Sequence, residues 1–149
     1  MAKMISTKTH GVLDYLTVGQ LLALPRMLGW RKGVTQWMSG MALGTLAYSL
    51  ITRYEVGPIK LLPMQGHLAL DFLSGLTFCA APLIFPKEDT TVQATLVGIG
   101  LFEIVASLST ETQPSYGEQA SEFMQDTTNN IGDAVQSMTD TPNERTVGA

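Results

Sequence analysis

Two histidines and two aspartates recur at one spacing in the first half of the chain. His10 precedes Asp14 by four residues, His67 precedes Asp71 by four, and the two pairs lie 57 residues apart. Residues four apart share one face of an α-helix, so each pair presents an imidazole beside a carboxylate. Two imidazoles and two carboxylates suit a tetrahedral Zn²⁺ shell. The same groups also suit proton transfer or a hydrogen-bonded contact between two helices.

Three interpretations of this paired His-x-x-x-Asp pattern remain open. In the first, each aspartate accepts a hydrogen bond from a histidine or hydroxyl of an opposing helix, with Thr17 and Ser74 nearby, and locks two helices together. In the second, the four groups bind or carry a proton, a small ion or a divalent metal, and Glu103 extends the path. This ligand pattern resembles the transport site of cation-diffusion zinc transporters. In the third, His10 and His67 ligate a haem. The sequence requires no cofactor, and we favour the structural interpretation, with ion binding or transport as the alternative.

Enzymatic chemistry is disfavoured by what the sequence lacks. It contains no phosphate-binding loop, no dinucleotide fingerprint and no recognisable nucleophile–base arrangement. Its single cysteine, Cys79, cannot form an intrachain disulfide or a cysteine-based metal cluster. The basic residues do not cluster, which argues against nucleic-acid binding. We therefore expect a non-enzymatic protein with a structural or partner-binding role, its partner being a second copy or another membrane protein.

Four apolar segments must position these residues. They run over about residues 7–28, 33–52, 63–85 and 91–110. Each has ~20 residues, the length of helix that crosses ~30 Å of hydrocarbon. A body of about 110 residues cannot enclose four apolar helices, because small domains leave much of their surface exposed. The sequence therefore predicts an all-α fold with four transmembrane helices in a lipid bilayer, formed by residues 1–110.

The first and third segments repeat each other. THGVLDYLT at residues 9–17 recurs as GHLALDFLS at 66–74, and Pro25 recurs as Pro82, again 57 residues on. The second and fourth segments share Ser-Leu-x-Thr, at 49–52 and 107–110, with a shift of one residue. The predicted unit is a helical hairpin used twice, over about 7–52 and 63–110. Two such units are parallel repeats about an axis along the membrane normal. Both His-Asp pairs would then lie at one depth, and they would converge if the first and third helices meet across that axis. Charged groups at that depth are functional candidates.

The third segment resembles a known repeat. Residues 74–85, with SG at the start and APL near the end, resemble the SPW repeat of small bacterial membrane proteins, and LPR at 24–26 is a more diverged copy. The resemblance covers roughly residues 7–110. It implies a multi-pass protein of the bacterial inner membrane and assigns no catalytic residues.

Small, cyclic and aromatic residues add expectations about packing. Gly40 and Gly44 form a G-x-x-x-G pair in the second segment and are expected to let helices of this chain approach closely. Pro25 and Pro82, late in their segments, are expected to mark a kink or a helix end. Four aromatic residues near segment ends are expected at the lipid headgroups: Trp30, Trp37, Tyr48 and Tyr54.

The last 39 residues differ in composition from the rest. Residues 1–110 carry eight Lys/Arg and six Asp/Glu, whereas residues 111–149 carry one, Arg145, and seven. Pro114, Pro142 and many polar residues accompany these acids, so we expect a largely disordered acidic tail. A patchy apolar stripe leaves a transient amphipathic helix as the alternative: Ala120, Phe123, Met124, Ile131, Val135 and Met138.

Overall fold

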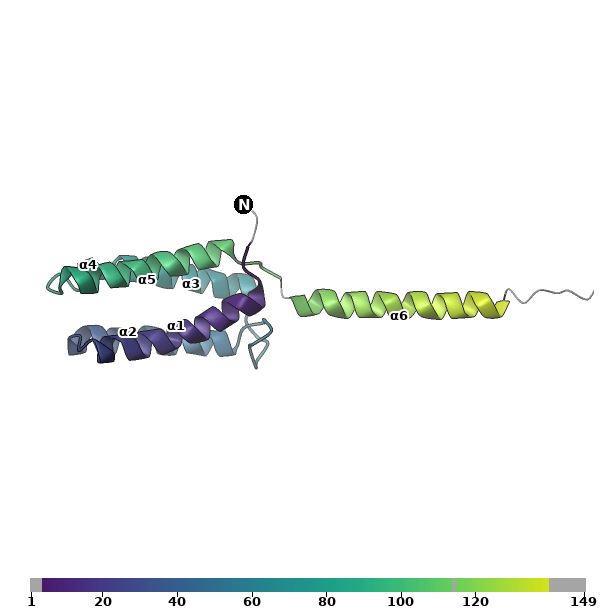
Figure 1. Cartoon of the computed structure of the whole chain (residues 1–149), viewed down its shortest axis with the longest axis horizontal. Helices are drawn as coiled ribbons and strands as arrows, with labels where there is room; N and C mark the ends of the chain where they lie inside the picture. The colour runs from purple at the N-terminus through teal and green to yellow at the C-terminus, as the bar shows by residue number, and fades with distance from the viewer. Residues whose placement is uncertain (1–3, 114, 140–149) are drawn as a thin grey trace, which may run out of the picture. The chain divides into compact units, whose positions relative to one another are not determined.

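The fold is all-α, as the sequence predicts. The computed structural model describes the backbone of residues 4–113 and 115–139 and the side chains of 4–113 and 124–137. Its helices are α1 (Thr7–Met27), α2 (Lys32–Leu50), α3 (Met64–Cys79), α4 (Ala81–Ile84), α5 (Thr90–Ser109) and α6 (Ser115–Thr139) (Figure 1). The chain divides into two units, Met1–Ser115 and Tyr116–Ala149.

The first unit consists of two helical hairpins. In hairpin one, α1 packs along α2; in hairpin two, α3 and the short α4 pack along α5 (Figure 1). The Ser6 hydroxyl caps α1 by accepting a hydrogen bond from the Thr9 main-chain N–H at 3.2 Å. Gly29, with φ of +65°, provides the left-handed turn after α1 that reverses the chain toward α2. The helices thus begin and end where local sequence chemistry favours it.

The internal repeat is visible in the main-chain hydrogen bonds. Ile5, before α1, forms a parallel bridge with Thr110 after α5, and Leu62, before α3, forms the equivalent bridge with Thr52 after α2. Each bridge ties the start of one hairpin to the end of the other. The start residues differ by 57 positions and the end residues by 58, which is the register of the sequence repeat. The two hairpins are therefore structural repeats of each other, and Thr52 and Thr110 occupy equivalent positions in them.

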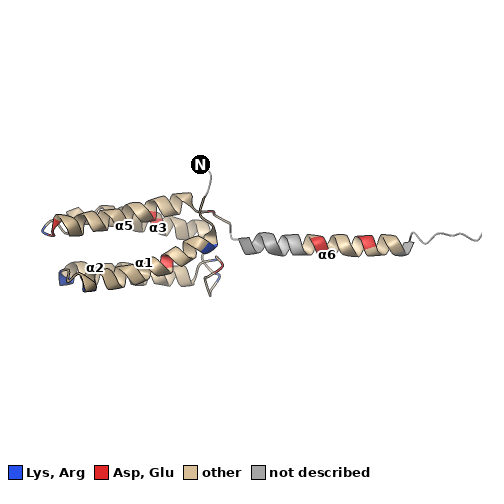
Figure 2. Ribbon diagram, viewed as in Figure 1, with Lys and Arg blue, Asp and Glu red and all other residues tan. Residues whose placement is uncertain are grey.

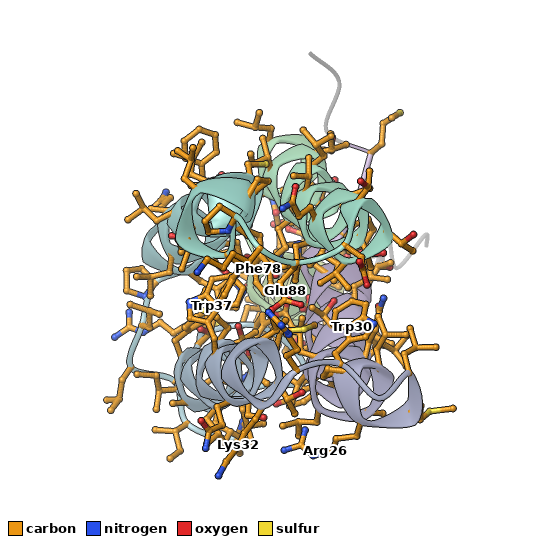
Figure 3. The ribbon with its side chains drawn as sticks, turned by 90° about the vertical axis from the view of Figure 1, so that its left-hand side faces the viewer. Arg26, Trp30, Lys32, Trp37, Phe78 and Glu88 are labelled. Carbon is orange, nitrogen blue, oxygen red and sulfur yellow. The ribbon has the colours of Figure 1, made fainter. Side chains whose placement is uncertain are left out.

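The interior has an apolar part and a polar part. The apolar core lies toward the α1–α2 turn and includes the fully buried Leu21, Met38, Phe78 and Leu96. Trp37 packs edge-on against Phe78, with ring centroids 4.9 Å apart (Figure 3). Toward the bridges the interior becomes polar, and a small second apolar cluster closes that end: Tyr54, Met64 and Leu68. Trp37 is partly buried and packs against the apolar core near the start of α2.

The outer surface of the hairpins is rich in large apolar side chains. Leu16, Leu43, Leu73, Val105 and Leu108 are each more than half exposed. Among the described helices, α5 is the one whose length and composition suffice to cross a membrane. The helix predicted over 63–85 is instead divided: α3 ends at Cys79 after 16 residues, and α4 follows. The structure thus shows helices in all four predicted segments without establishing four membrane spans.

Proline and glycine positions explain the break and the close packing. Pro82 lies at the start of α4, where its missing N–H does no harm, and Pro25 lies two residues before the end of α1. The expected role of Gly40 and Gly44 is wrong, because both are exposed and a Cβ at either position would meet no atom within 4 Å. Close packing occurs instead between α3 and α5. A Cβ on Gly75 would lie 2.7 Å from the main-chain oxygen of Gly100.

The C-terminal tail contains a helix where disorder was the main expectation. Residues Ser115–Thr139 form α6, the amphipathic alternative. The compositional argument failed here because Met124, Ile131 and Val135 recur at helical spacing, and the helix continues through Gly132. Pro114, Pro142, Arg145 and the side chains of Ala120, Phe123 and Met138 lie outside the described residues.

Candidate metal centre

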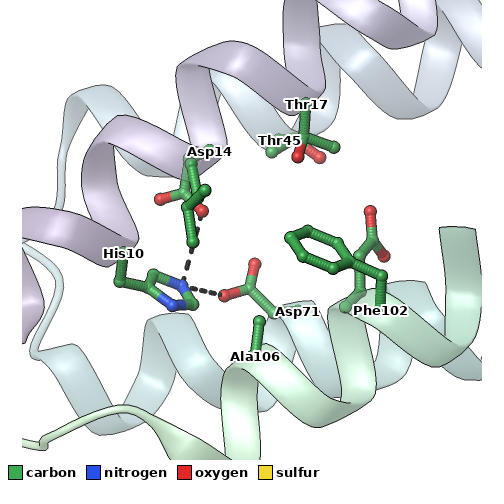
Figure 4. A pocket seen from close by; sticks show the side chains of 9 residues that line it. His10, Asp14, Thr17, Thr45, Asp71, Phe102 and Ala106 are labelled. Atoms are coloured by element: carbon green, nitrogen blue, oxygen red, sulfur yellow. Dashed lines mark hydrogen bonds and ion pairs between the residues drawn. The ribbon is translucent and has the colours of Figure 1, made fainter. Parts of the chain in front are cut away.

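The structure brings both predicted His-Asp pairs together between the hairpins. His10 and Asp14 come from α1, His67 and Asp71 from α3, and all four are buried. One potential ligand atom of each residue lies within 4.8 Å of the others. His10 Nε2 is 2.8 Å from Asp71 Oδ2 (Figure 4). His67 Nε2 is 3.0 Å from Asp14 Oδ2. The contacts within each helix are 3.4 Å and 3.1 Å. These separations are those of hydrogen-bonded or ion-paired groups, and a tetrahedral Zn²⁺ ion would place neighbouring ligand atoms about 3.4 Å apart.

Each imidazole is held from behind by a threonine of the other hairpin. His10 Nδ1 lies 2.8 Å from Thr110 Oγ1, and His67 Nδ1 lies 2.8 Å from Thr52 Oγ1. Each threonine hydroxyl donates its own proton to a main-chain carbonyl four residues earlier, at 2.6 Å in both cases. A hydroxyl has one proton, so it must accept its second hydrogen bond from the imidazole. Both histidines therefore carry a proton on Nδ1.

This fixed Nδ1 proton leaves two states for the Nε2 atoms that face the carboxylates. If the rings are neutral, two lone pairs and two carboxylates point at one another, and only a cation between them makes this favourable. If the rings are charged, each Nε2–H donates to a carboxylate. A divalent cation or two ring protons would equally neutralise the two negative charges. The two buried carboxylates of the cluster therefore need two positive charges beside them, from a divalent cation or from two protonated rings.

The two rings differ in their contacts. His10 Nε2 lies 2.8 Å from Asp71 Oδ2 in hydrogen-bond geometry, as a charged ring would, whereas the geometry at His67 favours the first state. Its Nε2 is fully buried and lies near two carboxylate oxygens, at 3.0 Å and 3.1 Å, yet neither contact has hydrogen-bond geometry. A proton on this atom would therefore be poorly satisfied at a substantial cost. A metal ion, which bonds along the lone pair, would satisfy it.

Hydroxyl groups of hairpin one orient the carboxylates. Tyr48 Oη donates to Asp71 Oδ1 at 2.6 Å, and Tyr54 Oη and Ser49 Oγ donate to Asp14 Oδ2 at 3.3 Å and 3.4 Å. Burial, reinforced by the nearby Asp14 carboxylate, raises the pKa of the Tyr54 hydroxyl above its ordinary value, so this group stays a donor. The Tyr48 contact leaves Asp71 Oδ2 facing both imidazoles. Asp14 instead directs Oδ1 to His10 and Oδ2 to His67.

The sequence prediction missed both tyrosines. It placed Tyr48 and Tyr54 at the lipid headgroups, whereas Tyr54 is fully buried and both contact the cluster. One signal was available. Thr45, Tyr48 and Thr52 recur every three or four residues along one side of an otherwise apolar helix, which marks a polar face. The fully buried position of Tyr54, in the connection after α2, had no comparable signal.

The repeat is broken beside Asp14, and a cavity results. In hairpin two, Ala106 occupies the place of Tyr48 and Glu103 the place of Thr45. The missing ring leaves about 20 Å³, enough for about one water molecule or ion. The cavity is lined by His10, Leu13, Asp14, Thr17, Thr45, Asp71, Phe102, Glu103 and Ala106 (Figure 4). Glu103 is buried there, and its Oε2 has no hydrogen-bond partner within the described part of the chain.

Comparison with known proteins adds no assignment. No family model matches the chain, and no curated protein or solved structure matches it significantly. The resemblance to SPW-repeat proteins therefore stays a prediction.

Proposed function

We propose that this chain is an integral membrane protein whose four-helix bundle binds a divalent metal ion between its two hairpins. The distribution of polar and apolar side chains supports the membrane location. Both histidines and the carboxylates of Asp14, Asp71 and Glu103 are buried, whereas large apolar side chains cover the outside. Lys and Arg lie toward the ends of the bundle helices, away from their middle (Figure 2). Water disfavours this arrangement and lipid favours it.

One observation carries the metal proposal. Both Nδ1 atoms donate to threonine hydroxyls whose own protons are already committed, so in the neutral rings both Nε2 lone pairs face the converging carboxylates. Metal-binding histidines characteristically donate their second ring N–H to such a partner, which fixes the tautomer and the ring orientation. The two nitrogen and two oxygen ligands suit Zn²⁺ and related divalent transition metals better than Mg²⁺ or Ca²⁺.

A structural lock is the second candidate, and one observation favours it. The His10–Asp71 and His67–Asp14 contacts both join one hairpin to the other. With doubly protonated rings these two pairs would hold the hairpins together without metal. The two functions differ in the effect of metal on stability. A bound ion stabilises the folded chain by about 2.7 kcal/mol at a hundredfold excess over Kd, whereas a lock gains nothing from added metal.

The test is a Co²⁺ titration of the detergent-purified, metal-stripped full-length chain. Cobalt in a tetrahedral nitrogen–oxygen site gives a visible absorption band. We expect saturation at about one Co²⁺ per chain, and loss of the band in Asp14→Asn. Asp89→Asn is the matched control, because Asp89 is an exposed carboxylate at the start of α5. A folded wild-type chain that shows no cobalt band and no stabilisation by Zn²⁺ would leave the lock as the function.

A further inference from the structure

The two sides of the metal centre differ although the hairpins repeat. On the side between α2 and α3, Tyr48 fills the space next to the cluster. Its hydroxyl donates to Asp71 at 2.6 Å, and its ring centroid lies 5.0 Å from that of His67. On the side between α1 and α5, Ala106 stands at the equivalent position and leaves the cavity beside Asp14. The cluster is thus covered on one side, whereas a small cavity lies beside it on the other.

The same difference continues further along the bundle. A wider groove between α1 and α5 is lined by Thr17, Gln20, Thr95, Gly98, Ile99 and Phe102. Thr17 and Phe102 also line the small cavity, so the two spaces adjoin. In hairpin one, the place of Thr95 is taken by Trp37, which packs into the core against Phe78. Thr17, Gln20 and Thr95 therefore add hydroxyl and amide groups to a mostly apolar groove on one side of the bundle. Trp37 occupies the equivalent place on the other side.

Glu103 lies where these two spaces reach the cluster. Its side chain is buried and lines the cavity together with His10 and Asp14, and its Oε2 has no hydrogen-bond partner within the described residues. A buried oxygen without a partner is costly unless a ligand or water satisfies it. The sequence position matched to it in hairpin one is the uncharged Thr45. The third carboxylate is therefore present only on the side that has the cavity.

We infer that Glu103 is the access carboxylate of the metal centre, the first protein ligand of a divalent cation that enters and leaves between α1 and α5. This inference rests on the metal site proposed above. The cation would first replace a water ligand by an oxygen of Glu103. It would then bind the Asp14 carboxylate and the imidazoles and lose its bond to Glu103. An ionised carboxylate in a cavity with low-dielectric walls raises the local concentration of cations.

Stopped-flow Co²⁺ binding to the full-length apo-protein in detergent tests this role. Glu103→Gln keeps the shape and removes the charge. We expect association and dissociation to slow by about tenfold or more, with Kd changed by less than about threefold. Glu88→Gln is the charge-matched control, because Glu88 lies before α5 and faces Arg31 at 3.7 Å. Its rates should equal those of the wild type.

Phe102→Ala provides an independent variant, since Phe102 is half exposed and lies at the boundary of the two spaces. Removing the ring should accelerate association by about threefold or more. Unchanged rates in both variants would overturn the inference, as would a Glu103→Gln chain that binds weakly at an unchanged association rate. A wild-type chain that binds no Co²⁺ would instead refute the metal site itself.

Discussion

His10 Nε2 and Asp71 Oδ2 lie 2.8 Å apart, although 61 residues separate them and they belong to different hairpins. The equivalent contact between His67 and Asp14 is 3.0 Å. Each imidazole therefore contacts the carboxylate of the other hairpin as well as that of its own helix. This crossing makes the four groups one cluster rather than two independent pairs, and it is the basis for the predictions that follow.

The threonine behind each imidazole should matter for metal affinity. Thr110→Val removes the hydroxyl that accepts from His10 Nδ1, and we expect Co²⁺ affinity to fall by about 10- to 100-fold with the helices intact. Thr77→Val is the control, because the exposed Thr77 makes the same kind of bond to a carbonyl four residues earlier and does not touch the cluster. Equal affinity in the two variants would show that the ring tautomer is not set by this contact.

The Tyr48 hydroxyl should stabilise the metal-free bundle. Tyr48→Phe leaves Asp71 Oδ1 without its 2.6 Å donor, so we expect the free energy of unfolding in detergent to fall by about 1–3 kcal/mol. Tyr15→Phe should change it less, because the Tyr15 hydroxyl bonds a loop carbonyl at 3.3 Å outside the cluster. The prediction fails if both variants unfold at the same denaturant concentration.

The close approach of α3 and α5 should be sensitive to one methyl group. Gly75→Ala would place a Cβ 2.7 Å from the Gly100 carbonyl oxygen, a main-chain atom that cannot move aside cheaply. We expect a loss of about 1–3 kcal/mol of unfolding free energy. Gly40→Ala, in open space, should be neutral or slightly stabilising. If Gly40→Ala lowered the free energy of unfolding more than Gly75→Ala does, the contact between α3 and α5 would be wrong.

The membrane location has a direct cellular test. The full-length chain should sediment with membranes, resist extraction by high salt and alkaline carbonate, and dissolve only in detergent. This expectation follows from the proposed membrane location, in which lipid would cover the exposed Leu16, Leu73 and Leu108. A folded monomer that remains in the supernatant without detergent would contradict this prediction.

The sequence predicted the His-Asp cluster but not the cavity beside it. The repeat over 9–17 and 66–74 predicted that His10, Asp14, His67 and Asp71 would converge, because equal spacing on equivalent helices places equal side chains at one depth. The cavity beside Asp14 could not be predicted in this way. It arises because Ala106 stands where the repeat would place a tyrosine. The sequence shows this difference, but it does not show which side chains surround the space that the missing ring leaves.

The glycines and the tail show a different limit. Gly40 and Gly75 are both small residues in apolar helices, and only the direction of the helix face decides which one meets another helix. In the tail, composition argued for disorder, whereas the spacing of Met124, Ile131 and Val135 argued for the helix that α6 forms. Composition averages over positions, so it cannot register such periodicity.

Metal content after purification from zinc-supplemented cells tests the central claim most directly. Elemental analysis of the detergent-purified wild-type chain should give about one divalent metal ion per chain, and the double variant His10→Gln, His67→Gln should retain less than about a tenth of that. Helical content and elution volume would verify that both proteins are folded. A folded wild-type chain with no bound divalent metal, or with the same content as the double variant, would contradict the account.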